Sequence, residues 1–268
     1  MADQSLNFDE IYARYGTRLY TLAYRITGRR EDAEDALQSA CLQIAGGISG
    51  FRHESALYTW LYTIVQREAR KHAVRQRRLP VDVYAQENNL TLEEVFAHVN
   101  ALGETEDVAL TNAAREQCLQ VFMNCMPPTQ RVVFTLRVIL RCTVNETAQI
   151  MDMSPGAVST SLHRGRALIA SFLEGRCSLY NPENPCKCSS WALYCQSNPH
   201  KIKETELAVI RESRQALAVT FKHEVGTLMA LSHIYNARFG PDSPQFSQKL
   251  TELLKSDMTL LGAQRTRD

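Results

Sequence analysis

Apolar residues in this chain recur at three- and four-residue intervals, and nowhere do they alternate with polar residues as they do in a half-buried strand. The first such stripe covers residues 8–26, and Gly28 is placed to end its helix. A second stripe covers 31–44 and has acids in its first turn, where the helix dipole favours negative charge. A third helix is predicted from about residue 56 to residue 78, ended by Pro80. The pattern predicts an all-α fold.

The charges are segregated along the chain, although the formal net charge is only +1. Residues 67–78 carry six Lys and Arg against one Glu, whereas residues 79–110 carry seven acids and no Lys or Arg. A small net charge therefore does not exclude binding to a nucleic acid, because the basic residues are concentrated on one segment. The sequence predicts a basic helix followed by an acidic linker.

The acidic stretch has weak periodicity, which indicates a linker with at most one short helix. At 268 residues the chain is long enough for two small domains that each close a core. Beyond residue 174 the sequence becomes rich in Cys, Pro and Asn, and two more helices are expected after that. The predicted organisation is a first domain at 1–80, a linker at 81–110, a second domain at 111–175, a Cys-rich segment at 176–200 and a C-terminal helical hairpin at 201–268.

Two helix starts lie close together in the second domain. Thr143 and Glu146 form a capping box, in which a hydroxyl and a carboxylate satisfy the free amides of a helix start. Ser154 supplies a second N-cap, followed by Pro155 at the first helical position. Such spacing predicts a helix-turn-helix or a similar helical hairpin. If the second helix enters a major groove, its outward residues are Ser154, Gly156, Ala157, Ser159, Thr160, His163 and Arg164, with Arg166 joining Arg164 at the phosphates. The alternative is a hairpin whose polar face is only solvated.

Two sets of motifs resemble those of extracytoplasmic-function sigma factors, a group within the sigma-70 family. The sequence DAEDALQ at 32–38, LYTWLYTI at 57–64 and the basic run that follows resemble region 2 of these proteins. The sequence MPPTQRVVF at 126–134, the capping box and LHRGR at 162–166 resemble region 4. Two matching domains in the family's order are more specific than either alone.

The resemblance covers residues 7–78 and 111–174 and implies a non-enzymatic alternative sigma factor. Such a protein binds core RNA polymerase, selects promoter DNA and in some cases has an anti-sigma partner. The resemblance implies that the acid-rich helix contacts the polymerase through Asp32, Glu34, Asp35 and Gln38. It implies that the −10 element meets a basic face and base-capturing tyrosines, here Arg67, Lys71, Arg75, Arg78, Tyr58 and Tyr62. Region 4 would read the −35 element, and the acidic linker would lie in the RNA-exit path.

Each of these surfaces has a plainer interpretation. The acids also suit an ordinary solvated helix start, and the basic residues suit a solvated face. Alternate spacing on a helix cannot place Tyr58, Trp60 and Tyr62 on one side. Trp60 is therefore expected in the core, and the two tyrosines are the better candidates for DNA.

Four of the eight cysteines are concentrated in the Cys-rich segment, in the pattern C-x8-C-x-C-x6-C. Four thiolates can surround one soft ion tetrahedrally, which predicts a Zn or Cu site although no cofactor is required for the main function. Redox-sensing thiols and ordinary free thiols are the alternatives. The other four cysteines are expected to be small buried hydrophobes. The candidate ligands are Cys177, Cys186, Cys188 and Cys195.

Other functions fit the sequence less well. A helix-turn-helix regulator that acts without polymerase would leave the first domain unexplained. No catalytic set of residues stands out, which argues against an enzyme. The last helices weakly resemble the helical-hairpin aspartyl-phosphate phosphatases of sporulation control, but Thr251 stands where that motif has an acid. The tail is therefore expected to be a packing or partner-binding hairpin.

No apolar run approaches the length of a membrane span, and the start of the chain lacks the features of a signal peptide. The sequence predicts a cytoplasmic protein.

Overall fold

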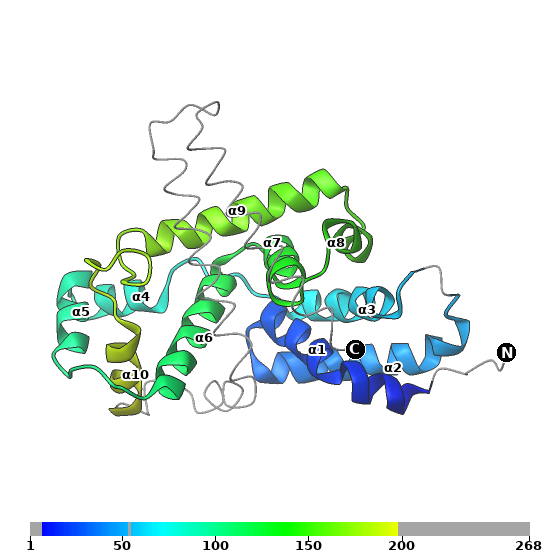
Figure 1. The fold of residues 1–268 in the computed structure, drawn as a ribbon, viewed down its shortest axis with the longest axis horizontal. Helices are drawn as coiled ribbons and strands as arrows, with labels where there is room; N and C mark the ends of the chain where they lie inside the picture. The colour runs from blue at the N-terminus through cyan, green and yellow to red at the C-terminus, as the bar shows by residue number, and fades with distance from the viewer. Residues whose placement is uncertain (1–6, 53–54, 198–268) are drawn as a thin grey trace. The chain divides into compact units, whose positions relative to one another are not determined.

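The computed structural model describes residues 7–52 and 55–197 (Figure 1). All the named secondary-structure elements within those ranges are helices. The same ranges also contain an isolated parallel β-bridge between Cys177 and Cys186. The all-α prediction is confirmed. In chain order the elements are α1 Phe8–Thr27, α2 Arg30–Gly47, η1 Ile48–Gly50, α3 Leu57–His72, α4 Pro80–Glu87, α5 Leu92–Asn100, α6 Val108–Cys125, α7 Pro128–Phe134, η2 Thr135–Ile139, α8 Val144–Met151, α9 Pro155–Leu173 and α10 Cys188–Ser197.

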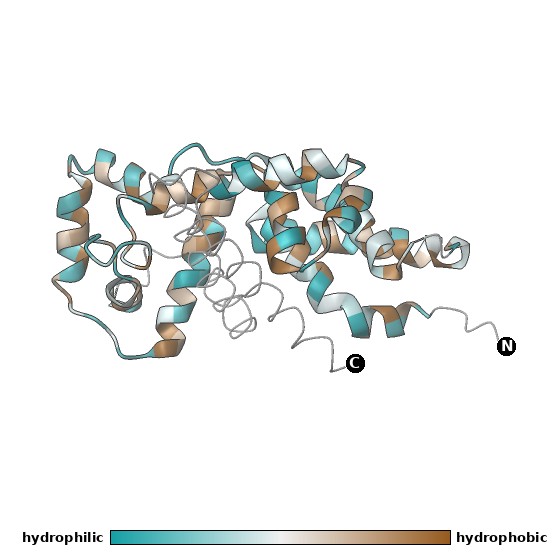
Figure 2. Ribbon diagram, turned by 45° about the horizontal axis from the view of Figure 1, so that its top comes forward, coloured by the Kyte–Doolittle hydropathy of each residue, from teal (hydrophilic) through white to brown (hydrophobic). Residues whose placement is uncertain are grey.

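The first three long helices pack on one another through the apolar stripes seen in the sequence. Helix α1 ends at Gly28, whose φ of 75° is left-handed and whose N–H donates to the Tyr24 carbonyl at 2.8 Å. Ala33, Ala36 and Ala40 on α2 are fully buried, because small side chains let the helices approach closely. Figure 2 shows that these helices carry both hydrophobic and hydrophilic residues, and the residues that α2 buries are Ala33, Ala36, Leu37, Ala40 and Ile44.

Helix α3 is shorter than predicted, because it ends at His72 rather than near residue 78. Beyond it the chain bonds to α6: the Gln76 N–H donates to the Asn124 carbonyl at 2.9 Å, and Arg75 Nε donates to the Cys125 carbonyl at 3.1 Å. Pro80 opens α4 at its first helical position instead of closing α3. These long-range hydrogen bonds outweigh the local preference for a longer helix.

The predicted linker holds two helices, α4 and α5, rather than one at most. Thr91 and Glu94 form a capping box at the start of α5, of the same kind as the one predicted at 143–146. The linker sequence therefore contains a helix-start motif, the capping box of Thr91 and Glu94, that the sequence analysis did not identify.

The second domain contains the predicted helix-turn-helix. Thr143 and Glu146 form both hydrogen bonds of the capping box at α8. Asp152 ends α8 with a left-handed φ of 52°, and the Ser154 hydroxyl caps α9 by accepting from the Ala157 N–H at 3.2 Å. Helix α7 continues into η2, a turn of π-helix over 135–139. The capping box and the N-cap predicted for this motif are therefore both formed.

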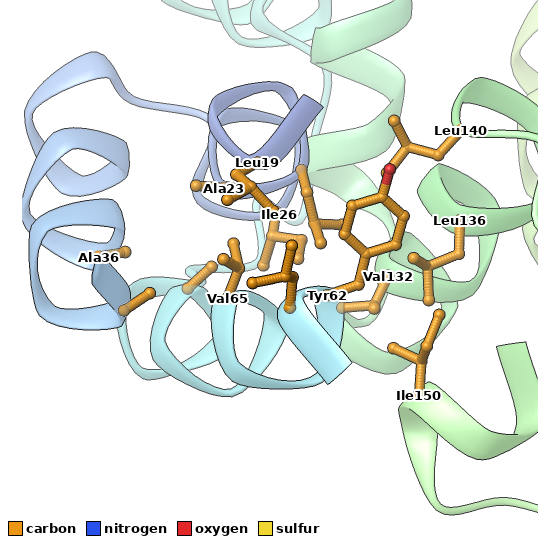
Figure 3. Close-up of a cluster of buried hydrophobic side chains, with 14 of the residues drawn as sticks. Leu19, Ala23, Ile26, Ala36, Tyr62, Val65, Val132, Leu136, Leu140 and Ile150 are labelled. Atoms are coloured by element: carbon orange, nitrogen blue, oxygen red, sulfur yellow. The ribbon is translucent and has the colours of Figure 1, made fainter. Parts of the chain in front are cut away.

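One hydrophobic cluster extends across both predicted domains. Side chains of α1, α2 and α3 meet those of α7, η2 and α8 in a continuous buried group. Figure 3 shows Tyr62 extending from α3 towards Val132, Leu136 and Leu140. Ile150 of α8 is buried beside the same group. All described residues belong to one compact unit.

The predictions for the C-terminal hairpin at 201–268, including its likeness to phosphatases, lie outside the described residues. Within the described ranges, no helix has both the length and the apolar character needed to cross a bilayer.

Candidate nucleic-acid and polymerase interfaces

Helix α2 presents the predicted acid-rich face to solvent. Glu34, Asp35 and Gln38 are exposed, and Asp32 is half-buried. Arg30 pairs with Glu34 at 2.7 Å, and Arg29 pairs with Asp32 at 3.7 Å. Because the alanines on the opposite side of α2 enter the core, the polar face is held outward as a rigid surface.

The two candidate tyrosines lie on one face of α3, with ring centroids 5.8 Å apart. The Tyr58 hydroxyl donates to the Glu146 carboxylate of α8. Burial, reinforced by the hydrogen bond and charge of Glu146, raises the pKa of Tyr58. Tyr62 is 1% exposed, and burial raises its pKa to about 12. In this arrangement Tyr62 is part of the core, whereas the sequence predicted that it is available to DNA.

Trp60 lies on another side of α3, as its spacing from the tyrosines requires. Its ring is 5.4 Å from that of Phe51, and it is partly buried against the hydrophobic cluster. A side-chain carbon added at Gly47 would stand 3.3 Å from the Trp60 ring. These contacts support the predicted packing role of Trp60.

The basic candidates do not form one helical face. Arg67 and Lys71 are exposed on α3, but Arg75 and Arg78 lie beyond its end. Lys71 bonds to Glu68 at 2.6 Å, and this bond, with one from Gln43, lowers the pKa of Glu68. The basic residues therefore lie partly on α3 and partly on the short non-helical segment that follows it.

Sequence reasoning missed a shallow hollow where this chain turns into α4. It is lined by the side chains of Gln76, Arg77, Arg78, Pro80, Val83, Tyr84 and Glu87. It forms because the chain leaves the helix at His72 and re-enters one at Pro80, which the local pattern did not predict.

The outward face of α9 matches the predicted recognition surface. Val158, Gly165 and Ile169 are buried on the inner face of the helix, which packs on α7. Ala157 and Arg166 are half-buried. The exposed candidates are Ser154, Gly156, Ser159, Thr160, His163 and Arg164.

Arg131 joins the two helical regions from a completely buried position. Its guanidinium donates to the carbonyls of Ile26 at 2.6 Å, Val74 at 3.0 Å and Asn124 at 2.8 Å. Burial lowers its pKa to about 10, which still leaves it charged at neutral pH. Gln66 Nε2 adds a bond from α3 to the Ile150 carbonyl of α8 at 3.2 Å.

The cysteine candidates separate into two groups. Cys177 and Cys186 are paired in the β-bridge, and Cys188 begins α10. The pKa of each is raised, first by burial and, for Cys186 and Cys188, then by neighbouring thiols of the group. Cys195 lies further along α10, and burial alone raises its pKa to about 11. Burial also raises the pKa of Cys118 of α6, which was not among the candidates, and the charges of Cys186, Cys188 and Cys177 add to the rise.

Comparison with known proteins gives two family matches. Residues 11–79 match the model for Sigma-70 region 2, and residues 116–169 match the model for Sigma-70 region 4. Both matches end before the Cys-rich segment.

Relatives that match this chain over most of their own length are sigma factors. The RNA polymerase sigma-H factor of Pseudomonas aeruginosa is 28% identical over 171 residues, which cover 62% of this chain and 86% of that protein. The ECF RNA polymerase sigma-E factor of Escherichia coli strain K12 is 28% identical over 166 residues, which cover 60% of this chain and 84% of that protein. The ECF RNA polymerase sigma factor SigM of Mycobacterium tuberculosis strain H37Rv is 27% identical over 167 residues, 62% of this chain and 76% of that protein.

A solved structure, the sigma factor RpoE in complex with the anti-sigma factor NepR from Bartonella quintana, aligns with a TM-score of 0.42 and 16% identity over 62% of this chain and 96% of that one. The two family matches, in sequence order, and the sigma-factor relatives together show the family. The chain belongs to the extracytoplasmic-function group of the sigma-70 family, and it is an alternative sigma factor.

Proposed function

We propose that this sigma factor docks on core RNA polymerase through the exposed face of α2 and reads the −35 element with the exposed face of α9. The observation that carries the proposal is that both polar faces stay in solvent while the opposite faces of the same helices build the core. A helix anchored in this way holds its polar side chains in a fixed register, which reading a groove requires. The same function implies that the protein acts in the cytoplasm, where transcription occurs.

We propose further that the described arrangement is a closed state that opens before promoter melting. Helix α8 covers the tyrosine face of α3: Tyr62 is buried and the Tyr58 hydroxyl is bonded to Glu146. An unpaired −10 base would need at least one of these rings uncovered to stack on it. Separating α3 from α8 exposes that face.

Transcription in vitro with core polymerase tests the main proposal. The full chain should direct initiation at a defined start site in a promoter-dependent manner. Failure to bind core polymerase, or start sites that do not change when it binds, would overturn the proposal. Tight binding to duplex DNA without the polymerase would instead support a stand-alone helix-turn-helix regulator.

A matched pair of charge reversals tests the docking face. Asp35→Arg reverses an exposed acid on α2, and Glu10→Arg reverses an exposed acid on α1. Only Asp35→Arg is expected to weaken binding to core polymerase. Equal losses in the two variants would show that net charge, and not the α2 face, governs binding.

Energy transfer between two dyes tests the opening step. Leu42 on α2 and Ala167 on α9 are both exposed, lie outside the candidate contact residues and can carry labels introduced as unnatural amino acids. Transfer efficiency should fall when core polymerase binds. Unchanged efficiency in an active holoenzyme would contradict the opening. An anti-sigma partner stays a prediction from the family resemblance.

A further inference from the structure

The acidic linker is bonded near both of its ends to residues 176–197, which are called the clasp from here on. Arg176 of the clasp pairs with Asp82 of α4, with Nη1 and Oδ1 3.0 Å apart. Lys187 of the clasp pairs with Glu104, which follows α5, with Nζ and Oε1 2.7 Å apart. The linker has acids and no Lys or Arg of its own. The clasp therefore supplies the cations that pair with two of the linker's acids.

Between these two acids the linker packs its apolar residues on the clasp. Helices α5 and α10 lie side by side (Figure 1). The Trp191 ring meets Phe96 edge to face with centroids 6.5 Å apart, and the Tyr194 ring meets His98 in the same way at 6.2 Å. The buried residues of α5 are Val95, Phe96 and Val99. The clasp thus covers an apolar face as well as pairing with acids.

The helices of the linker are too short to be stable alone. Helix α4 has eight residues and α5 has nine, whereas isolated helices below about 12–15 residues are marginal in water. Helix α5 packs mainly on α4 and α10. Because α4 belongs to the linker itself, α10 is the partner that comes from outside it. The folded state of the linker therefore depends on the clasp.

The clasp is itself fixed to the region 4 match. Asn184 Nδ2 donates to the Glu174 carbonyl at 2.9 Å and to the Cys177 carbonyl at 3.1 Å. The Cys186 N–H donates to the Arg176 carbonyl at 2.8 Å, and α10 packs on α6. Among the described residues, no three His, Cys, Asp or Glu side chains stand where they could hold one metal ion. Protein hydrogen bonds and helix packing hold the clasp in place.

A folded linker limits how far regions 2 and 4 can separate. The positions that name the −10 and −35 elements differ by about 25 base pairs, or about 85 Å of duplex. Residues rise 1.5 Å each in a helix and at least about 3.3 Å each in an extended chain, so unfolding α4 and α5 lengthens the linker by about 30 Å. Reading both elements at once favours the longer linker.

The contacts between clasp and linker can be released without opening the main core. Among the described residues, the hydrophobic cluster that extends across both domains includes none from α4, α5 or α10. The Lys187 and Glu104 side chains are 46% and 51% exposed, and pairs this exposed contribute little individually. The clasp is therefore a separable and reversible contact.

We propose that the clasp is an autoinhibitory device that holds the linker folded in the free protein and releases it when core RNA polymerase binds. The proposal rests on the proposed function, since only a chain that docks on the polymerase and reads both promoter elements needs the longer linker. It adds a second lock to the contact between α3 and α8. The two locks differ in place, because the clasp acts on the linker and not on the tyrosine face.

Cross-linking in the full chain tests the release. A water-soluble carbodiimide joins an amine to a carboxylate in direct contact, as Lys187 is with Glu104. The Lys71–Glu68 pair, 2.6 Å apart within α3, is the internal control, because it forms without the clasp. Peptide mapping should find both products in the free protein. In the holoenzyme, the Lys187–Glu104 product should fall at least about fivefold relative to the control.

The outcomes separate the clasp from the proposed function. A free protein that gives the Lys71–Glu68 product without the Lys187–Glu104 product overturns the clasp. An undiminished Lys187–Glu104 product in a holoenzyme that initiates transcription overturns the release while leaving the proposed function intact. A chain that does not bind core polymerase overturns the proposed function, and the release with it.

Hydrogen exchange in the free full chain tests whether the clasp keeps the linker folded. Trp191→Ala removes the ring that covers Phe96 and should speed exchange of the α5 amides at least about tenfold, with the amides of α1 unchanged. Phe51→Ala is the matched control, because it removes another half-buried ring, packed 5.4 Å from Trp60. It should leave α5 exchange unchanged. Unchanged α5 exchange in Trp191→Ala, or equal acceleration of α5 and α1, overturns the proposal.

Discussion

The Arg25 guanidinium and the Glu116 carboxylate meet at 2.5 Å between α1 and α6, with 4% of each side chain exposed. Gln120 adds a hydrogen bond to the same guanidinium at 3.1 Å. The pair joins the region 2 match to the region 4 match from inside the protein. Burial raises the pKa of Glu116, although the positive charge and hydrogen bonds of Arg25 act in the opposite direction. The two regions are thus held together by a polar contact as well as by the shared hydrophobic cluster.

Removing one partner of this pair should be far more costly than removing an exposed pair. Glu116→Ala leaves the Arg25 charge buried without its carboxylate, and unfolding free energy should fall by about 3–5 kcal/mol. Urea denaturation followed by circular dichroism measures this. Asp32→Ala, which removes the partner of the largely exposed Arg29, is the control and should change it by less than about 1 kcal/mol. Equal effects of the two variants would contradict a buried pair.

Gly28 is the glycine whose replacement should matter most for the junction of the two regions. Its φ is +75°, and an added Cβ would stand 2.3 Å from Asn124 Oδ1 of α6. Gly28→Ala should therefore destabilise the protein by more than the about 1–2 kcal/mol of the left-handed backbone alone. The double variant with Asn124→Ala relieves the clash and should recover only the excess, as measured by urea denaturation. Gly50→Ala, where nothing lies within 4 Å, is the matched control.

Local sequence signals were sufficient where local contacts decide the structure. The capping box at Thr143, the N-cap at Ser154 and the helix end at Gly28 were all predicted and all form. Helix α3 ends early because Gln76 bonds to Asn124, a residue far along the chain. No periodicity within residues 56–78 carries that information.

The candidate sites show the same division. The outward positions of α2 and α9 follow from helix geometry, so the exposure of Asp35 and Arg164 was predictable. The burial of Tyr62 was not, because the helix that covers it belongs to the other domain. The packing of α6 on α10 was not predictable for the same reason, because the two helices are far apart in the sequence.

The stability of the closed state should depend on pH through Glu146. Burial acts to raise the pKa of this carboxyl, but hydrogen bonds from Tyr58 and Thr143 outweigh it and lower the pKa below its ordinary value. A carboxyl whose pKa is lower in the folded than in the unfolded state contributes stability above the unfolded value, about 4.3, and loses it as pH falls through the folded pKa. Glu146→Gln should therefore lower unfolding free energy more at pH 7 than at pH 3. Equal losses at the two pH values would refute this role.

Tyr58→Phe should show the same hydrogen bond from the α3 side. The substitution removes the donor to Glu146 and should lower unfolding free energy by about 1.5–3 kcal/mol at pH 7, the range for a bond to a charged group. It should also favour opening, so energy transfer between α2 and α9 should fall in the free protein. Tyr12→Phe on α1, where the side chain is largely exposed, is the control for loss of a tyrosine hydroxyl elsewhere. A drop in stability with unchanged energy transfer would contradict a role of this hydrogen bond in holding the closed state.

Arg164 gives the sharpest test of the DNA surface, because it is exposed on the outward face of α9. Arg164→Ala in the holoenzyme should weaken binding to −35 DNA and reduce the slope of log affinity against log salt by about 1, as expected when one phosphate contact is lost. Arg14→Ala, which removes an exposed arginine from α1, should leave the slope unchanged. A fluorescence anisotropy titration at several salt concentrations measures both. If Arg164→Ala changes neither affinity nor slope, the helix enters the groove with a different face, and the recognition residues have to be reassigned.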